Sequence, residues 1–285
     1  MAEPTRNPRL HHSRRPRLGQ NFLVSPSAPR AIADALGDLS DSTVLEIGPG
    51  KGVITRLLAA RSKHLVAVEL DATLAAALKK EFAGEDGPEV EVICDDVLRV
   101  DFRKLASAYA SSSSNKLVVA GNLPYYITSD ILLHLFEHHS AIDRAVLMVQ
   151  REVADRIVAT PGNRDYGVLS ATTQMYAHVE GLFTLPPGAF SPPPEVHSTV
   201  LRFTMQPRFA ELSVDRQRFL TFLRRAFAQK RKTLANNFRV AGYRSALIEA
   251  ALATCRLDPM VRAEAVSLER MACLFHALED LNRTS

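Results

Sequence analysis

Short apolar runs alternate with amphipathic stretches along the chain as far as Gln150. The runs predict buried strands at residues 43–47, 65–69, 90–94, 117–121 and 144–149. Apolar side chains recur at helical spacing in the intervening segments, residues 29–36, 53–61, 72–82 and 129–138. This alternation predicts a doubly wound, mostly parallel α/β sheet of the Rossmann-like class.

After Gln150 the pattern changes. Helical spacing covers residues 151–158 and 168–176, and two further strands are predicted at residues 179–185 and 196–203. A late strand pair of this kind is expected to close the sheet with an antiparallel edge. Beyond Pro207 only helical spacing is found, at residues 215–236, 245–255 and 267–281. We therefore expect a flexible arm, an α/β domain and a small all-helical domain, at residues 1–17, 18–207 and 208–285.

The composition is that of an ordinary globular protein. Of its 285 residues 46% are hydrophobic and 23% charged, enough for one large and one small domain. No apolar run is long enough to span a membrane, and the start lacks a hydrophobic signal core. Cys94, Cys255 and Cys273 show no paired spacing, so we expect buried, reduced thiols and a cytoplasmic protein.

Basic residues gather in two segments, although the net charge is only +4. Residues 1–17 carry five arginines against Glu3, and residues 208–239 carry nine lysines or arginines against two acids. Either cluster alone is explained by solvated surface charge, but the two together favour a polyanionic partner. His11-His12 and His138-His139 lack metal-ligand partners at suitable spacing, so we expect surface pairs and no metal site.

A glycine turn follows the first strand in Glu46-Ile47-Gly48-Pro49-Gly50-Lys51-Gly52. Glycines here let the backbone approach a nucleotide-like ligand closely. Glu69 ends the second strand, and Asp95-Asp96 ends the third. A carboxylate at the end of the second strand is able to accept hydrogen bonds from both ribose hydroxyls of an adenosine. A single acid at a strand end is often only a helix cap. NAD would fit the same turn, but the sequence offers no hydride-transfer site.

The most informative segment is Asn122-Leu123-Pro124-Tyr125, at the end of the fourth predicted strand. An adenine N6 amine is a poor nucleophile because its lone pair is delocalised into the ring. The Asn122 side-chain oxygen and the Leu123 carbonyl are each able to accept one N6 proton, which directs the lone pair at an electrophile. Tyr125 is able to stack on the base. A simple turn that closes a strand is the alternative explanation.

These segments resemble the motifs of the ribosomal RNA small-subunit adenine N6,N6-dimethyltransferases of the KsgA type. The resemblance covers most of the chain. Besides the segments already quoted, it is carried by Leu18-Gly19-Gln20-Asn21-Phe22-Leu23, Asp96-Val97-Leu98, Phe190-Ser191-Pro192-Pro193-Pro194-Glu195-Val196-His197-Ser198 and Gln229-Lys230-Arg231-Lys232-Thr233-Leu234.

The resemblance implies S-adenosylmethionine as the cofactor. It implies a cofactor site lined by Gln20, Asn21, Leu23, Gly48, Gly50, Glu69, Asp96 and Asn122. It favours Asp96 over Asp95, and it sets Phe190 across a flipped adenine from Tyr125. Tyr126 stands where many relatives carry Asn, and we expect it to alter the wall of the base pocket.

The same resemblance makes residues 208–285 an RNA-docking domain. Basic side chains on helix flanks follow phosphates without reading sequence. The candidate RNA-binding residues are Arg218, Arg224, Arg225, Lys230, Arg231 and Lys232.

The sequence thus predicts a monomeric enzyme that dimethylates N6 of two adjacent adenines in a hairpin loop near the 3′ end of small-subunit (16S) ribosomal RNA. Its partner would be the small ribosomal subunit, with no membrane and no metal involved. Two alternatives stay open. One is a relative of the macrolide-resistance type that modifies large-subunit RNA. The other is a non-catalytic factor for small-subunit assembly.

Overall fold

The computed structural model describes residues 20–84, 88–109 and 116–283. The predicted basic arm at residues 1–17, His11-His12 and the motif residues Leu18 and Gly19 lie outside these ranges. The strands are β1 (Phe22–Leu23), β2 (Thr43–Ile47), β3 (His64–Glu69), β4 (Val90–Cys94), β5 (Leu117–Asn122), β6 (Ile142–Gln150), β7 (Ala177–Leu185), β8 (Phe190–Ser191) and β9 (Ser198–Met205). The helices are α1 (Ala28–Ala35), α2 (Thr55–Ala59), α3 (Ala72–Glu81), α4 (Phe102–Ala108), α5 (Thr128–Glu137), α6 (Arg151–Val158), α7 (Val168–Tyr176), α8 (Arg216–Ala226), α9 (Leu234–Val240), α10 (Ser245–Thr254) and α11 (Leu268–Arg283).

The main sheet has the strand order β4-β3-β2-β5-β6-β9-β7. Pairing is parallel from β4 to β6 and antiparallel where β9 joins β6 and β7 joins β9. The doubly wound, mostly parallel sheet with an antiparallel edge pair is therefore confirmed. A separate two-stranded sheet joins β1 to β8, which the sequence patterns did not predict because each strand has only two residues.

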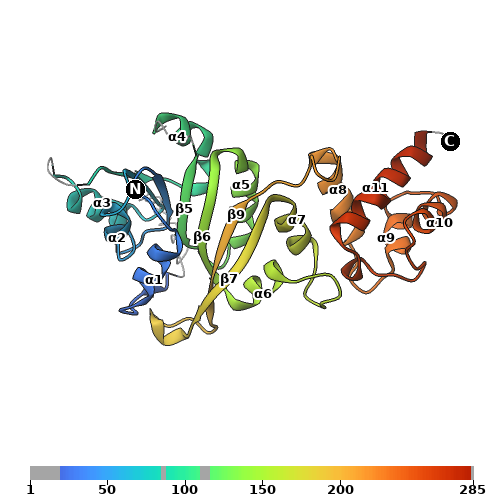
Figure 1. Ribbon diagram of the computed structural model, residues 1–285. Coiled ribbons are helices and arrows are strands. Elements are labelled where there is room, and N and C mark those ends of the chain that lie inside the picture. Colours follow the sequence, from blue (N-terminus) through green and yellow to red (C-terminus); the bar gives the residue numbers. More distant parts are fainter. Residues whose placement is uncertain (1–19, 85–87, 110–115, 284–285) are drawn as a thin grey trace, which may run out of the picture.

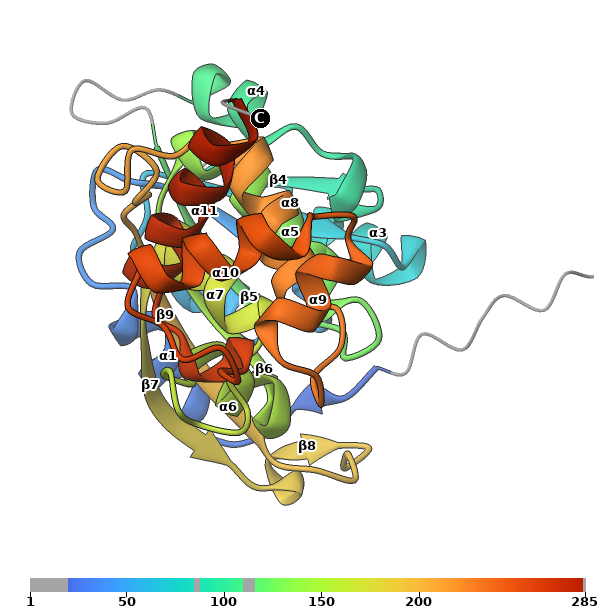
Figure 2. The ribbon, with the colours of Figure 1, turned by 90° about the vertical axis from the view of Figure 1, so that its right-hand side faces the viewer.

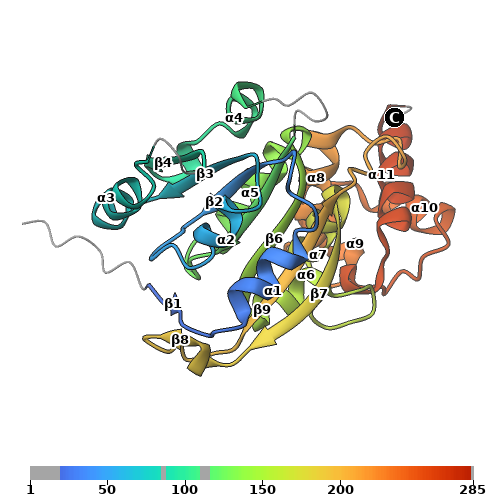
Figure 3. The same ribbon diagram turned by 60° about the vertical axis from the view of Figure 1, so that its left-hand side comes forward.

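Side chains of alternate strand residues enter two cores on opposite faces of the sheet. Val44, Val118 and Val146 pack with Ile32 of α1 and Leu58 of α2. The intervening strand residues pack instead against α4 to α7. Figure 3 shows α1 and α2 on one face of the strands, and Figure 1 shows α6 and α7 on the side that leads to the C-terminal helices.

Helices α8 to α11 pack on one another at one end of the molecule (Figure 2). Their core is continuous with the core of the sheet, because α8 contacts α7 and the ring of Phe227 meets that of Tyr166 edge-on at 5.8 Å. Arg208, which follows β9, donates to Glu211 and to Glu269 of α11, both at 2.7 Å. The division at residue 208 stays a prediction.

The single helix predicted over residues 215–236 is wrong. Helix α8 ends at Ala226, and α9 starts after Thr233, whose side chain accepts from Asn236 N at 3.2 Å. Buried Asn237 explains the break, since its Nδ2 donates to the carbonyls of Ala226, at 2.7 Å, and Gln229, at 3.3 Å. These bonds satisfy a helix end that would otherwise lack donors.

Two further expectations need correction. Cys255 and Cys273 form a disulfide between α10 and α11, with their Cα atoms 6.0 Å apart, and Cys94 is exposed at the end of β4. The spacing of the cysteines could not show this, because the packing of the helices brings them together. His138 is buried rather than on the surface, with Nδ1 2.9 Å from the carbonyl of His134, and His139 is half-buried.

Candidate active site

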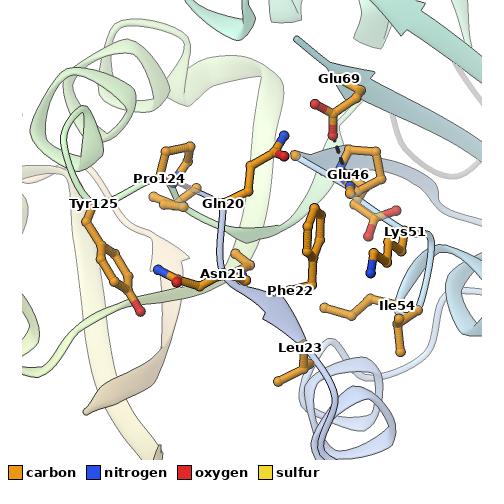
Figure 4. Close-up of a pocket in the computed structure, with 16 residues that line it drawn as sticks. Gln20, Asn21, Phe22, Leu23, Glu46, Lys51, Ile54, Glu69, Pro124 and Tyr125 are labelled. Atoms are coloured by element: carbon orange, nitrogen blue, oxygen red, sulfur yellow. Dashed lines mark hydrogen bonds between the residues drawn. The ribbon is translucent and has the colours of Figure 1, made fainter. Parts of the chain in front are cut away.

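A cleft opens where the parallel strands β2, β3 and β5 end, and it has two lobes. Gln20, Gly48, Glu69 and Pro124 line both lobes. The first lobe is completed by residues of the glycine turn, the segment before α1 and the Asn122 motif: Asn21, Phe22, Leu23, Glu46, Pro49, Gly50, Lys51, Val53, Ile54, Asn122, Leu123 and Tyr125. In Figure 4 residues 20–23 cross between Tyr125 on one side and Glu46 and Glu69 on the other.

The glycine turn is shaped by close packing as well as by backbone conformation. Gly50 has φ +58°, and a Cβ atom there would lie 3.2 Å from the ring of Phe22. Gly52 has φ +75°, and a Cβ atom there would lie 2.7 Å from Leu78 of α3. Only glycine combines this conformation with this space. The turn therefore brings its backbone directly to the cleft, as the sequence predicts.

Buried Glu69 is fixed at the end of β3 by two backbone donors. Its Oε2 accepts from Gly50 N at 3.0 Å, and its Oε1 accepts from Asp71 N at 2.9 Å. Each carboxylate oxygen keeps a second lone pair. The carboxylate is thus oriented at the junction of the two lobes, with acceptor capacity for the hydroxyls of a ribose.

Glu46 is a functional candidate that the sequence analysis quoted only as part of the glycine motif. It is 2% exposed, it lines the first lobe, and its Oε2 has no hydrogen-bond partner. Burial, aided by the charge of Glu69, raises its pKa to about 7. A carboxyl group inside an apolar strand run, directly before the turn, is the signal that could have identified it.

Asn122 lies at the end of β5 with its side-chain amide held in place. Its Nδ2 donates to the carbonyl of Asn21 at 3.3 Å. The turn that follows is closed by Thr128, whose hydroxyl donates to the carbonyl of Pro124 at 3.0 Å. Asn21 therefore connects the segment before α1 to the motif, and this contact orients the Asn122 amide with its oxygen available as an acceptor.

Tyr125 lines the first lobe, and its hydroxyl is fixed by a residue of β9, the strand that pairs with β6. The Tyr125 hydroxyl lies 2.7 Å from Oγ of Ser198, which is fully buried at the start of β9. Ser198 had no assigned role in the sequence analysis. Its position could not be predicted, because it depends on the antiparallel pairing of β9 with β6.

Phe190 is not among the residues that line the two lobes, so its expected position across a flipped adenine from Tyr125 stays a prediction. Its ring is 3% exposed and packs in the core with Leu23 and Ala28. The physical reason is the pairing of β8 with β1, which sets Phe190 opposite Leu23. The pairing thus places the buried ring beside Leu23, which lines the first lobe.

The second lobe is a mainly apolar slot with acids at its edge. It is lined, besides the shared residues, by Ile47, Val68, Leu70, Asp95, Asp96, Val97, Tyr126, Ile127 and Ile131. Asp96 accepts from Leu98 N at 3.0 Å, and Asp95 accepts from Asp96 N at 2.7 Å. Both acids border the slot, so the preference for Asp96 stays a prediction.

The candidate RNA-binding residues fall into two groups. Arg218, Arg224 and Arg225 lie on α8, where Arg218 pairs with Glu279 of α11 and Arg225 donates to the Tyr243 hydroxyl at 3.3 Å. The other group, Lys230, Arg231 and Lys232, is exposed in the turn between α8 and α9. Because the helix predicted over residues 215–236 is interrupted after Ala226, the two groups do not lie on one continuous helix.

Residues 11–280 match the family model described as ribosomal RNA adenine dimethylase. The chain belongs to this family. A ribosomal RNA adenine dimethylase acts on RNA through S-adenosylmethionine-dependent methyl transfer, in agreement with the predicted enzyme class. The most similar relatives include "Ribosomal RNA small subunit methyltransferase A" of Acidobacterium capsulatum, 59% identical over 93% of this chain and 92% of its own length. The protein of the same name from Koribacter versatilis is 51% identical over 93% of this chain and 95% of its own.

Solved structures agree with the adenine dimethylase fold. The 23S rRNA methyltransferase ErmE matches with a TM-score of 0.67 at 25% identity, covering 91% of this chain and 100% of its own. A dimethyladenosine transferase from Plasmodium falciparum matches with a TM-score of 0.72 at 22% identity, covering 92% and 98%. At this identity the second match shows the fold alone.

The donor set of the cleft fits the methyl donor of a dimethylase. Glu69 offers acceptors for ribose hydroxyls, and the acid-edged slot suits an adenine with its amine. The unpartnered Oε2 of Glu46 suits a cationic group. Within the described ranges, no cluster of three or more His, Cys, Asp or Glu side chains is arranged to hold a metal ion. No helix in the same ranges is long and apolar enough to cross a membrane.

Proposed function

We propose that this chain methylates N6 of two adjacent adenines in a hairpin loop near the 3′ end of small-subunit ribosomal RNA, giving N6,N6-dimethyladenosine. The observation that carries the proposal is the held Asn122 amide beside Tyr125, at the mouth of a cleft suited to an adenosine. The high identity to proteins named small subunit methyltransferase A supports the choice of substrate.

The protein's part in the reaction is mainly positioning. Bound S-adenosylmethionine supplies a methyl group made electrophilic by its cationic sulfur. The Asn122 side-chain oxygen and the Leu123 carbonyl accept the two N6 protons of the target adenine, so its lone pair points at the methyl group. Tyr125, anchored by Ser198, stacks on the base. The methylated amine then loses its proton to water, and no strong general base is needed.

The remaining cleft residues hold the donor. Glu69 accepts hydrogen bonds from the ribose hydroxyls, and Asp96 accepts a hydrogen bond from the adenine amine. Gly48 and Gly50 allow close approach of the backbone. The donor site is completed by Gln20, Asn21 and Leu23.

We assign RNA docking to the part of the chain that contains helices α8 to α11. Four exposed basic side chains are able to contact phosphates whatever the RNA sequence: Arg224 of α8 and the turn residues Lys230, Arg231 and Lys232. Arg218 and Arg225 contribute from α8, where Arg218 already pairs with Glu279 of α11 and Arg225 already donates to Tyr243 between α9 and α10. Specificity then comes from the shape of the RNA and from unpaired adenines.

Two variants test these roles and serve as controls for each other. Asn122→Ala is expected to lower methyl transfer to undermethylated small subunits by at least about a hundredfold, the loss typical of one positioned hydrogen-bonding group. Its donor affinity, measured by calorimetry, remains measurable. Glu69→Ala is expected to weaken donor binding by about tenfold or more, as for a lost hydrogen bond to a charged group. Full activity of Asn122→Ala would contradict the catalytic role, and unchanged donor affinity of Glu69→Ala would contradict the ribose contact.

A further inference from the structure

Tyr126 has no part in the reaction as proposed, although it follows the Asn122 motif directly. Its side chain is 60% exposed, an unusual state for a large ring at the edge of a cleft. It lines the second lobe of that cleft. An exposed aromatic side chain beside a functional cavity is a candidate for ligand contact.

The two consecutive tyrosines serve different lobes. Tyr125 lines the first lobe and not the second, whereas Tyr126 lines the second and not the first. The turn at Pro124, closed by the Ile127 amide donating to the Pro124 carbonyl at 3.2 Å, sends the two rings apart. Tyr126 therefore lines the lobe that Tyr125 does not line.

The second lobe has the chemistry of a purine slot. Apolar side chains from three strand ends line it, and Asp95 and Asp96 stand at its edge with acceptors for an exocyclic amine. Leu70, which follows β3 and lines the same slot, is 47% exposed. The slot thus carries uncovered apolar surface from Leu70 and from Tyr126, and a flat ring inserted there would remove both from water.

We propose that Tyr126 stacks on the purine of the methyl donor and is a specificity-determining residue for that donor. The inference rests on the proposed function, since it takes the donor to be an adenosine derivative. The ring adds an exposed aromatic side chain to a slot whose other lining residues come mainly from strand ends and the turns that follow them. The phenol hydroxyl is not required, because a stack uses the ring face.

The test is calorimetric binding of two ligands that undergo no transfer, S-adenosylhomocysteine and methylthioadenosine. Both carry the purine, and only the first carries the amino acid. The variants are Tyr126→Asn, Tyr126→Phe and, as a control on the neighbouring helix outside the cleft, Leu133→Asn. We expect Tyr126→Asn to lower the affinity for both ligands by the same factor, roughly tenfold, within the range measured for base–aromatic stacks. Tyr126→Phe and Leu133→Asn are expected to bind both ligands as the unmodified protein does.

Thermal unfolding of each variant is expected to show that the fold is kept, because the substituted side chains are exposed. Unchanged affinity of Tyr126→Asn for both ligands would overturn the inference. So would unchanged affinity combined with a raised KM for small subunits, because Tyr126 would then contact RNA. If the unmodified protein bound neither ligand, the proposed function itself would fail, and the role of Tyr126 with it.

Discussion

Glu46 brings a carboxyl group that titrates near neutral pH into the first lobe of the cleft. Burial raises its pKa from 4.5 to about 7. Between pH 4.5 and about 7 the folded protein keeps a proton that the unfolded chain has lost. The free energy of unfolding therefore falls as the pH rises through this range. Such a costly position is typical of functional sites.

We expect ionised Glu46 to favour the cationic donor. Affinity for S-adenosylmethionine should therefore rise with pH between about 5.5 and 7.5, where the donor's amino group keeps its proton, by at most about tenfold per unit. Calorimetry across this range provides the measurement. In Glu46→Gln the dependence should disappear, and an equal slope in that variant would contradict the role of Glu46.

The contact between Tyr125 and Ser198 predicts a coupled pair. Removal of the hydrogen bond by Ser198→Ala should lower kcat by about fivefold, corresponding to about 1 kcal/mol, with donor affinity unchanged. Tyr125→Phe should have a similar effect. Because the two changes remove one interaction, the double variant should be no worse than either single one. Additive losses in transfer assays would show that the hydrogen bond does not position the ring.

At the residue scale, the sequence could not predict positions that depend on strand pairing and side-chain packing. The glycine turn, Glu69 and Asn122 follow from spacing, since parallel strands end at one edge. The positions of Ser198 and Phe190 do not follow from spacing. Ser198 meets Tyr125 because β9 pairs with β6, and Phe190 is buried because β8 pairs with β1. Both are antiparallel pairings between segments far apart in sequence. The lobe that Tyr126 lines could not be predicted either, because the turn at Pro124 separates it from Tyr125.

At the element scale, the turn between α8 and α9 depends on one buried side chain. Asn237→Ala would leave the carbonyls of Ala226 and Gln229 without their donor. We expect the free energy of unfolding to fall by about 1–3 kcal/mol, measured by urea denaturation. RNA affinity should fall as well, since the turn carries Lys230 to Lys232. The neighbouring Asn236→Ala is the control, and equal stability of the two variants would contradict this account.

The strands of the main sheet and most helices could be predicted because buried runs and amphipathic spacing are local signals. The antiparallel edge also follows from the change of pattern after Gln150, whereas the order of the strands was not predicted. The break after Ala226 could not be predicted, because Gln, Lys and Arg favour helix and the interruption comes from Asn237, a tertiary contact. The same holds for the disulfide between Cys255 and Cys273, which requires α10 and α11 to pack together.

At the scale of the whole molecule, the cleft at the edge of the sheet and the basic turn belong to two differently built parts. In the proposed function the sheet holds the donor and the target base, while the helices α8 to α11 extend from one end of it (Figures 1 and 2). The excess of basic residues lies mainly in the helical part, although the net charge of the chain is only +4. This arrangement suits an enzyme whose substrate is a large folded RNA rather than a free nucleotide.

The central claim is that the chain dimethylates adenine in small-subunit RNA. Its most direct test is nucleoside mass spectrometry after incubation with S-adenosylmethionine and, separately, undermethylated small subunits, large subunits and naked RNA. The account predicts N6,N6-dimethyladenosine in the small subunit alone. Product only in large-subunit RNA would contradict it in favour of a resistance-type enzyme, and no product in any sample would contradict it in favour of a non-catalytic assembly factor.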